Sequence, residues 1–146
     1  MDTYLTLLRE NGYKITPLRK AILDAFIEKR ASLTAERLCK LVRTSVPNAG
    51  LQSIYRNLAD FTQIGIVEEI FTDQRKTAYA LCDGISKHHH HAVCRHCSRA
   101  VEVNACELGS VSGVLSRSLQ KIRRKTGFLI EKHFLQLQGL CDACQS

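Results

Sequence analysis

Two short cysteine pairs constrain the fold of this chain more than any other feature. Cys94 and Cys97 form one C-x-x-C pair, and Cys141 and Cys144 form another. Four thiolates on two tight turns can make a closed tetrahedral zinc site, which would fasten the end of the chain to an earlier segment. A redox-active C-x-x-C and four unrelated thiols are the alternatives, but two such pairs in one short chain favour zinc. We therefore expect a structural zinc ion on these four cysteines.

The N-terminus and the composition indicate thiols that stay reduced. The opening residues, MDTYLTLLRENGYK, are charged and lack the apolar core of a secretion signal, and no apolar stretch is long enough to span a bilayer. Seven cysteines in such a chain point to metal ligands rather than disulfides, and we expect a cytoplasmic protein. The net charge of +7 is compatible with a polyanionic partner.

The N-terminal half predicts helices followed by a β-hairpin. Apolar residues recur at helical spacing, and the expected helices begin at about Thr3, Thr16, Thr34 and Leu51. Two β-prone runs, 66–71 and 77–82, then flank a polar turn. Helices followed by a hairpin, with a short helix-turn-helix just before it, predict a winged helix-turn-helix domain over residues 1–84.

The remaining residues predict a smaller domain of mixed structure. Turn-forming residues at 83–87 are the best candidate for a hinge. Strands are expected in HHHHAVC and AVEVNA, a helix from about 107 to 125, and another strand within FLIEKHFLQLQGLC. The predicted fold class is therefore α+β, with the winged helix followed by a small α/β domain over 85–146 that carries the structural zinc.

Four consecutive histidines, residues 88–91, precede the first cysteine pair. Their internal position argues against a purification tag. On an extended strand, His88 and His90 would share one face and His89 and His91 the other, so that the run could serve two metal sites. The alternative is a flexible tract that binds metal weakly. The other candidate ligands are Glu68, Cys82, Glu102, Glu107 and His133.

Several motifs resemble the ferric uptake regulator superfamily: GYKITPLRKAIL, LTAERL, GLQSIYRNLADFTQIGIVEEI, HHHHAVCRHC, AVEV and GLCDAC. The resemblance covers nearly the whole chain. It implies a homodimeric, metal-sensing transcriptional repressor with an N-terminal winged helix and a C-terminal dimerisation domain. It also implies structural zinc on the two C-x-x-C pairs, in agreement with the spacing argument.

The resemblance further implies a regulatory metal site between the two domains. The position twelve before Cys94 is a glutamate in typical iron sensors and an aspartate in peroxide sensors, whereas here it is Cys82, as in the zinc uptake regulator branch. A thiolate there favours Zn²⁺ over Fe²⁺. The iron-sensor histidine is also absent near Ser32. The implied zinc ligands are Glu68, Cys82, His89 and His91, with Glu102 as a replacement for Glu68.

A second family site is implied on the opposite face of the histidine strand. Its expected ligands are His88, His90, Glu107 and His133. The family glutamate would fall at Gly109, so that either Glu107 substitutes for it or the site is three-coordinate, weak or absent. Cys39 is expected to be a buried core thiol, and His96 an exposed loop residue rather than a ligand. Cys106 is expected to be structural, with a role as a spare ligand close to Glu107 as the alternative.

The winged helix would read DNA with the helix that starts near Leu51. The expected DNA contacts are Lys14, Arg19, Lys20, Gln52, Ser53, Tyr55 and Arg56. Tyr55 and Arg56 match a family motif, and the resemblance favours DNA contact over ordinary solvated side chains. The expected partner is an AT-rich palindromic operator, with zinc as corepressor of zinc uptake genes.

Three other functions compete with this prediction. Iron or peroxide sensing within the same superfamily is the nearest alternative. A zinc enzyme is disfavoured because the chain lacks H-E-x-x-H and has no H-x-E before a P-C-x-x-C. A zinc-stabilised interaction module without DNA binding would lack any zinc-dependent DNA complex.

Overall fold

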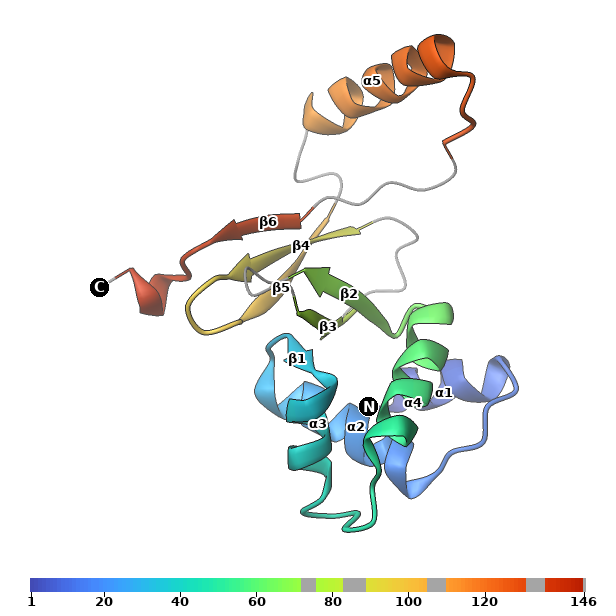
Figure 1. Ribbon diagram of the computed structural model, residues 1–146, viewed down its shortest axis with the longest axis vertical. Helices are drawn as coiled ribbons and strands as arrows, with labels where there is room; N and C mark the ends of the chain where they lie inside the picture. Colours follow the sequence, from blue (N-terminus) through green and yellow to red (C-terminus); the bar gives the residue numbers. More distant parts are fainter. Residues whose placement is uncertain (72–75, 83–88, 105–109, 131–135, 146) are drawn as a thin grey trace.

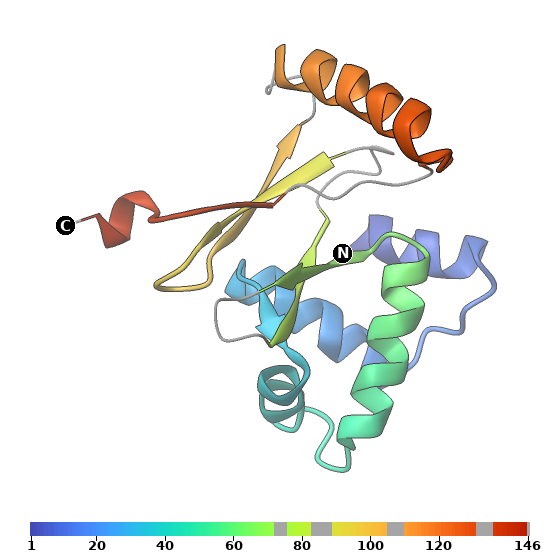
Figure 2. The same cartoon turned by 45° about the horizontal axis from the view of Figure 1, so that its top comes forward.

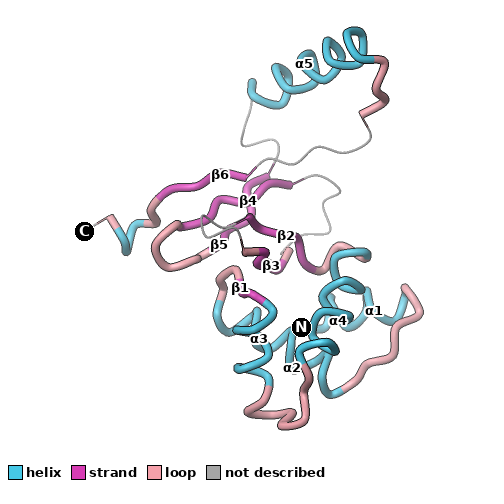
Figure 3. Tube along the Cα trace, in the orientation of Figure 1, coloured by secondary structure: helices cyan, strands magenta, loops and turns pink. Residues whose placement is uncertain are grey.

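The computed structural model describes residues 1–71, 76–82, 89–104, 110–130 and 136–145, and its elements form two units (Figure 1). The described residues up to 82 form a helical unit with a small sheet, called here the winged-helix unit. The described residues from 89 onward form a second sheet with one long helix, called here the C-terminal unit (Figure 3). The mixed fold of two units confirms the predicted α+β class. The predicted hinge at 83–87 lies outside the described residues, so the domain boundary stays a prediction.

Four helices build the winged-helix unit. They are α1 (Asp2–Glu10), α2 (Pro17–Lys29), α3 (Ala35–Val42) and α4 (Leu51–Gln63). Thr16 caps α2, because its hydroxyl accepts a hydrogen bond from the Arg19 amide at 3.2 Å, as the Thr16-Pro17 pair predicts. Thr34 caps α3 in the same way at 3.3 Å. Both helix starts are therefore fixed by local sequence.

The hairpin follows α4 as predicted. Gly65, at a φ of +76°, turns the chain after α4. The amide of Ile66 then donates to the Phe61 carbonyl at 2.8 Å. Strands β2 (Val67–Phe71) and β3 (Thr77–Leu81) then pair antiparallel. A two-residue strand that sequence reasoning missed, β1 (Leu33–Thr34), pairs with the other edge of β3.

The core of the winged-helix unit lies between its helices and this sheet. Ile54, Leu58 and Phe61 on α4 are fully buried, and they pack in one cluster with Phe26 of α2 and Leu38 of α3. Burial of each such side chain stabilises the fold by roughly 1.5–3 kcal/mol. The apolar spacing also predicts Leu51 on this inward face, but Leu51, the first residue of α4, is 38% exposed.

The C-terminal unit is a three-stranded sheet and a helix. Its strands are β4 (His89–Cys94), β5 (Ala100–Asn104) and β6 (Gln136–Gly139), in the order β5-β4-β6. β4 pairs antiparallel with β5 and parallel with β6. Helix α5 (Ser110–Thr126) lies on the side of this sheet away from the winged-helix unit (Figure 2). No helix in the described part of the chain is long and apolar enough to cross a membrane.

Candidate metal centres and nucleic-acid interface

The two cysteine pairs meet at one end of the second sheet. Cys94 ends β4, Cys97 lies in the turn that follows, and Cys141 and Cys144 belong to the 3₁₀ turn η2 (Asp142–Cys144) and its N-cap. The four potential ligand atoms lie within 4.8 Å of one another, and the Cys97 and Cys141 sulfurs are 3.6 Å apart. Tetrahedral zinc with Zn–S bonds of about 2.3 Å needs sulfurs about 3.8 Å apart. The tetracysteine cluster therefore fits a zinc ion.

The electrostatics of the cluster also suit a cation. Hydrogen bonds from the backbone amides of Cys97 and Cys141 lower the pKa of Cys94 to about 6, which favours its thiolate. The side-chain hydrogen bond with Cys141 and burial raise the pKa of Cys144 to about 12. A bound cation would deprotonate such a thiol outright. His96 is exposed, and its Nδ1 lies 3.4 Å from the Cys144 sulfur.

The predicted regulatory ligands come from both units. Glu68 on β2 and His91 on β4 meet directly, with 2.8 Å between Glu68 Oε2 and His91 Nδ1. His91 is only 1% exposed, and Cys82 is 4% exposed. Cys82 lies at the same end of the hairpin as Glu68, because its amide donates to the Ile66 carbonyl at 2.9 Å. Within the described ranges, the ligand atoms of the tetracysteine cluster lie close enough together to hold a metal ion. Glu68, Cys82 and His91 do not form such a group.

The histidine strand has the predicted extended geometry from His89 onward. His91 lies opposite Glu102 and His90 opposite Val103 across β4 and β5, so that neighbouring histidines face opposite sides. His90 is buried as well, at 4% exposure. The side chain of His89 lies outside the described residues. Three expected ligands of the second site also fall outside the described part of the chain, namely His88, Glu107 and His133. Cys106 falls outside it as well.

The exposed face of α4 carries the side chains expected to contact DNA. Gln52, Ser53, Tyr55 and Arg56 are all exposed. The Tyr55 hydroxyl donates to Glu36 Oε1 at 3.0 Å, so that α3 fixes the direction of this phenol. Lys14, which precedes α2, and Lys20, on its first turn, are also exposed. Cys39, expected in the core, is 5% exposed and lies 3.6 Å from the Ala49 carbonyl oxygen.

Arg19 has a different environment from the other predicted DNA contacts. Its side chain is 14% exposed and forms a 2.6 Å ion pair with Asp60 of α4. It also donates to the Lys14 carbonyl at 2.8 Å, and its guanidinium lies 5.0 Å from the centre of the Tyr13 ring. The ion pair joins α2 to α4, a role that sequence reasoning missed because no local pattern pairs residues this far apart.

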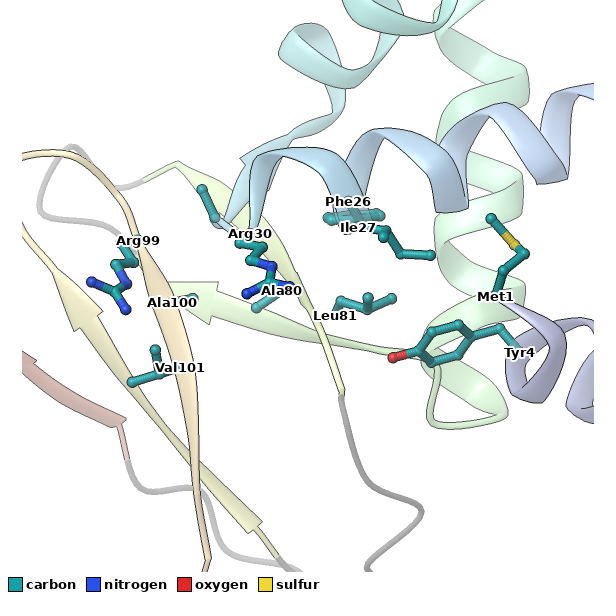
Figure 4. A pocket seen from close by; sticks show the side chains of 11 residues that line it. Met1, Tyr4, Phe26, Ile27, Arg30, Ala80, Leu81, Arg99, Ala100 and Val101 are labelled. Atoms are coloured by element: carbon teal, nitrogen blue, oxygen red, sulfur yellow. The ribbon is translucent and has the colours of Figure 1, made fainter.

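The two units are also joined by contacts that the sequence did not predict. Ser32 donates to the Ser98 carbonyl from both its amide and its hydroxyl. The backbone amide and carbonyl of Phe71 both form hydrogen bonds with the side chain of Gln136. A hollow of about 410 Å³ lies between the units, with Arg30 and Arg99 among its lining residues (Figure 4). Several polar contacts therefore join the units beside the Glu68–His91 pair, and Ile70, Ala78 and Ala80 of the hairpin share one buried apolar cluster with Val93 of β4.

A winged helix joined to a small sheet unit with a tetracysteine cluster defines a class of metal-binding, DNA-binding proteins. The Ferric uptake regulator family matches residues 10–138, and the chain belongs to this family. Family members are metal-responsive transcription regulators that bind DNA as dimers, and they are not enzymes. The resemblance that the motifs indicated is thus confirmed.

Known relatives and structures agree with this assignment. The peroxide operon regulator of Bacillus subtilis (strain 168) is 30% identical over 140 residues, covering 96% of this chain and 90% of that protein. The peroxide-responsive repressor PerR of Staphylococcus saprophyticus is 30% identical over 145 residues, covering 99% and 91%. A zinc uptake regulator complexed with zinc and DNA has a similar fold, with a TM-score of 0.76, 21% identity and coverage of 99% and 91%. The Helicobacter pylori ferric uptake regulator gives a TM-score of 0.60, 20% identity and the same coverage.

Proposed function

We propose that this protein is a zinc-responsive repressor of zinc uptake genes. Zinc would act as corepressor of a cytoplasmic homodimer that binds an AT-rich palindromic operator. Structural zinc would occupy the tetracysteine cluster, and regulatory zinc would bind at Glu68, Cys82, His89 and His91. Membership of the ferric uptake regulator family supports the coarser part of this function, namely metal-responsive DNA binding.

The observation that carries the choice of zinc is the thiol of Cys82. It is buried where β3 ends, at the end of the hairpin that also bears Glu68, and Glu68 contacts His91 of the other unit. A thiolate, imidazoles and one carboxylate suit tetrahedral Zn²⁺, and the soft thiolate favours Zn²⁺ over Fe²⁺. The chemistry of this donor set therefore supports zinc.

The Glu68–His91 contact suggests how the two units are held in one arrangement. Because Glu68 contacts Nδ1, the ring is oriented so that Nε2 would be the metal-binding nitrogen. Glu68 would then orient His91, and Glu102, which lies opposite His91, would complete the ligands. Alternatively, Glu68 would bind the metal itself. In both cases bound zinc would join residues of the hairpin to residues of β4. This would favour one spacing between the two winged helices of the dimer.

The exposed face of α4 would then contact the operator. Arg56 would bind a base edge or a phosphate, and Tyr55 would pack on a thymine methyl group or the sugar-phosphate backbone. Gln52 and Ser53, which are exposed on the first turn of α4, would add polar contacts. Lys14, Lys20 and Arg19 were predicted to hold phosphates, and the exposed Lys14 and Lys20 are the better placed for this role.

Peroxide sensing is the second candidate, because the relatives at 30% identity are peroxide-responsive regulators. The two functions differ in the metal that promotes DNA binding. Fluorescence anisotropy with an AT-rich palindromic duplex separates them when the metal-depleted protein is titrated with Zn²⁺, Fe²⁺ or Mn²⁺. We expect Zn²⁺ to promote binding at the lowest free concentration. Binding that needs Fe²⁺ or Mn²⁺, and that hydrogen peroxide abolishes in the Fe²⁺ form, would instead support the peroxide sensor.

A further inference from the structure

Ser32 fastens the winged-helix unit directly to the turn that carries the first cysteine pair. The Ser32 amide donates to the Ser98 carbonyl at 2.9 Å, and its hydroxyl donates to the same oxygen at 3.1 Å. Ser32 is only 3% exposed. Its neighbour Ala31 forms an antiparallel bridge with Arg99, so that the turn between β4 and β5 lies beside the start of β1 (Figure 1). One carbonyl thus satisfies two buried donors of the other unit.

The direction of that carbonyl depends on the geometry of the cysteine turn. Ser98 follows Cys97 and has a φ of +64°, a left-handed conformation that is uncommon for residues other than glycine. The turn holds it there, because the Ser98 amide donates to the Cys94 carbonyl and the Cys94 amide donates to the Arg99 carbonyl, both at 2.9 Å. Such a conformation persists only where its surroundings fix it.

A second attachment begins at the other half of the cluster. Gln136 of β6 donates to the Phe71 carbonyl at 2.7 Å and accepts from the Phe71 amide at 3.0 Å. Gln138 donates to the same carbonyl at 3.0 Å. β6 leads directly to Cys141, and Ser98 directly follows Cys97. The two attachments of the winged-helix unit therefore start from the two segments that the tetracysteine cluster joins.

We infer that occupancy of the tetracysteine cluster by zinc controls how the winged-helix unit docks, with Ser98 as the positioning residue. A tetrahedral ion would fix Cys94 and Cys97, and hence the turn that aims the Ser98 carbonyl at Ser32. Without the ion, Ser98 relaxes from its left-handed conformation and the buried donors of Ser32 lose their acceptor. The cluster is then a second control point for DNA binding. This last consequence rests on the proposed function.

Amide hydrogen exchange at Ser32 tests the coupling without using DNA. The zinc-loaded protein is compared with a Cys141→Ser/Cys144→Ser variant, and the amides of Ile54 and Leu58 in α4 report whether the winged-helix unit is still folded. We expect the Ser32 amide to exchange at least about tenfold faster in the variant, since two hydrogen bonds to one acceptor are lost, with the α4 amides unchanged. Equal protection of Ser32 in both proteins would overturn the inference.

A second pair of variants keeps all four cysteines. Proline at 98 cannot adopt a positive φ and has no amide, whereas glycine adopts it readily. With zinc content verified by elemental analysis, Ser98→Pro is expected to bind the AT-rich duplex about tenfold more weakly, in line with the loss of two hydrogen bonds, and Ser98→Gly to bind like the unmodified protein. Equal affinity of the two zinc-loaded variants would contradict the role of Ser98.

The two proposals fail in different ways. If Ser32 protection depends on the cluster but added zinc does not change DNA binding, the docking inference stands and zinc sensing fails. If zinc promotes DNA binding while Ser32 protection is the same with and without the cluster, zinc sensing stands and the docking inference fails.

Discussion

At the scale of single residues, the environment of Arg19 changes the role that its position alone suggests. The sequence places a basic residue at the start of a helix near the expected DNA face, which is typical of a phosphate contact. In the folded chain the same guanidinium is paired with Asp60 at 2.6 Å and is largely buried. Charge and position along a helix predict exposure well, but they do not reveal a partner that lies forty-one residues away.

We predict that Arg19→Ala destabilises the protein rather than merely weakening DNA binding. The substitution leaves the partly buried Asp60 without its partner and removes a hydrogen bond to the Lys14 carbonyl. The free energy of unfolding should fall by about 1–3 kcal/mol in urea denaturation. Lys20→Ala, at an exposed neighbour, is the matched control and should change it by less than about 0.5 kcal/mol. Equal effects of the two substitutions would contradict this role for Arg19.

Glu36 and Tyr55 give a residue-scale prediction that depends on pH. The Glu36 backbone amide, followed by the Thr34 hydroxyl and the Tyr55 phenol, lowers the pKa of Glu36 below its ordinary 4.5. Because the folded-state pKa lies below the unfolded value, this stabilisation is present above about pH 4.5 and is lost as the pH falls through the folded value. Hydrogen bonding to Glu36 raises the pKa of Tyr55 correspondingly.

Tyr55→Phe should therefore raise the pKa of Glu36, but only part of the way to 4.5, since the amide and Thr34 still lower it. An NMR titration of the Glu36 carboxyl carbon measures this directly. Ser53→Ala, on the exposed face of the same helix, should leave the titration unchanged. If Tyr55→Phe also leaves it unchanged, the hydrogen bond seen between α3 and α4 does not form in solution.

At the scale of elements, local signals predicted most of the structure. The caps at Thr16 and Thr34, the apolar spacing of Ile54, Leu58 and Phe61, and the turn at Gly65 each depend on residues close in sequence. β1 was missed because two residues form a strand only through pairing with β3, which no local pattern indicates. The parallel pairing of β6 with β4 could not be predicted either, although the cysteine pairs did indicate that the two segments meet.

The N-cap of α2 provides the test at this scale. Thr16→Ala removes the acceptor of the Arg19 amide and should lower the free energy of unfolding by about 1 kcal/mol. Thr16→Ser keeps a hydroxyl at the same place and should retain most of the stability. Urea denaturation of the two variants measures the difference. A loss as large for serine as for alanine would show that packing of the threonine methyl group, rather than capping, stabilises this helix start.

At the scale of the whole molecule, the arrangement of the two units is the property that sequence could not supply. The predicted ligands of the regulatory site come from the hairpin and from β4, so their meeting depends on how the units are placed. Glu68 and His91 do meet, and their contact is accompanied by the attachments at Ser32 and Phe71. Side-chain chemistry suggested which residues to bring together, whereas the placement depends on contacts between segments distant in sequence, which no local pattern reveals.

The most direct test of the proposed zinc sensing is zinc-dependent DNA binding by Cys82→Ser. The substitution replaces the thiol that favours zinc with a hydroxyl, and it leaves the tetracysteine cluster intact. We predict that the unmodified protein binds one tightly held zinc and at least one exchangeable zinc per chain. We further predict that Cys82→Ser keeps the tight ion but loses both the exchangeable one and the zinc-promoted binding of an AT-rich palindromic duplex. Full zinc-dependent DNA binding by Cys82→Ser would contradict the proposed regulatory site.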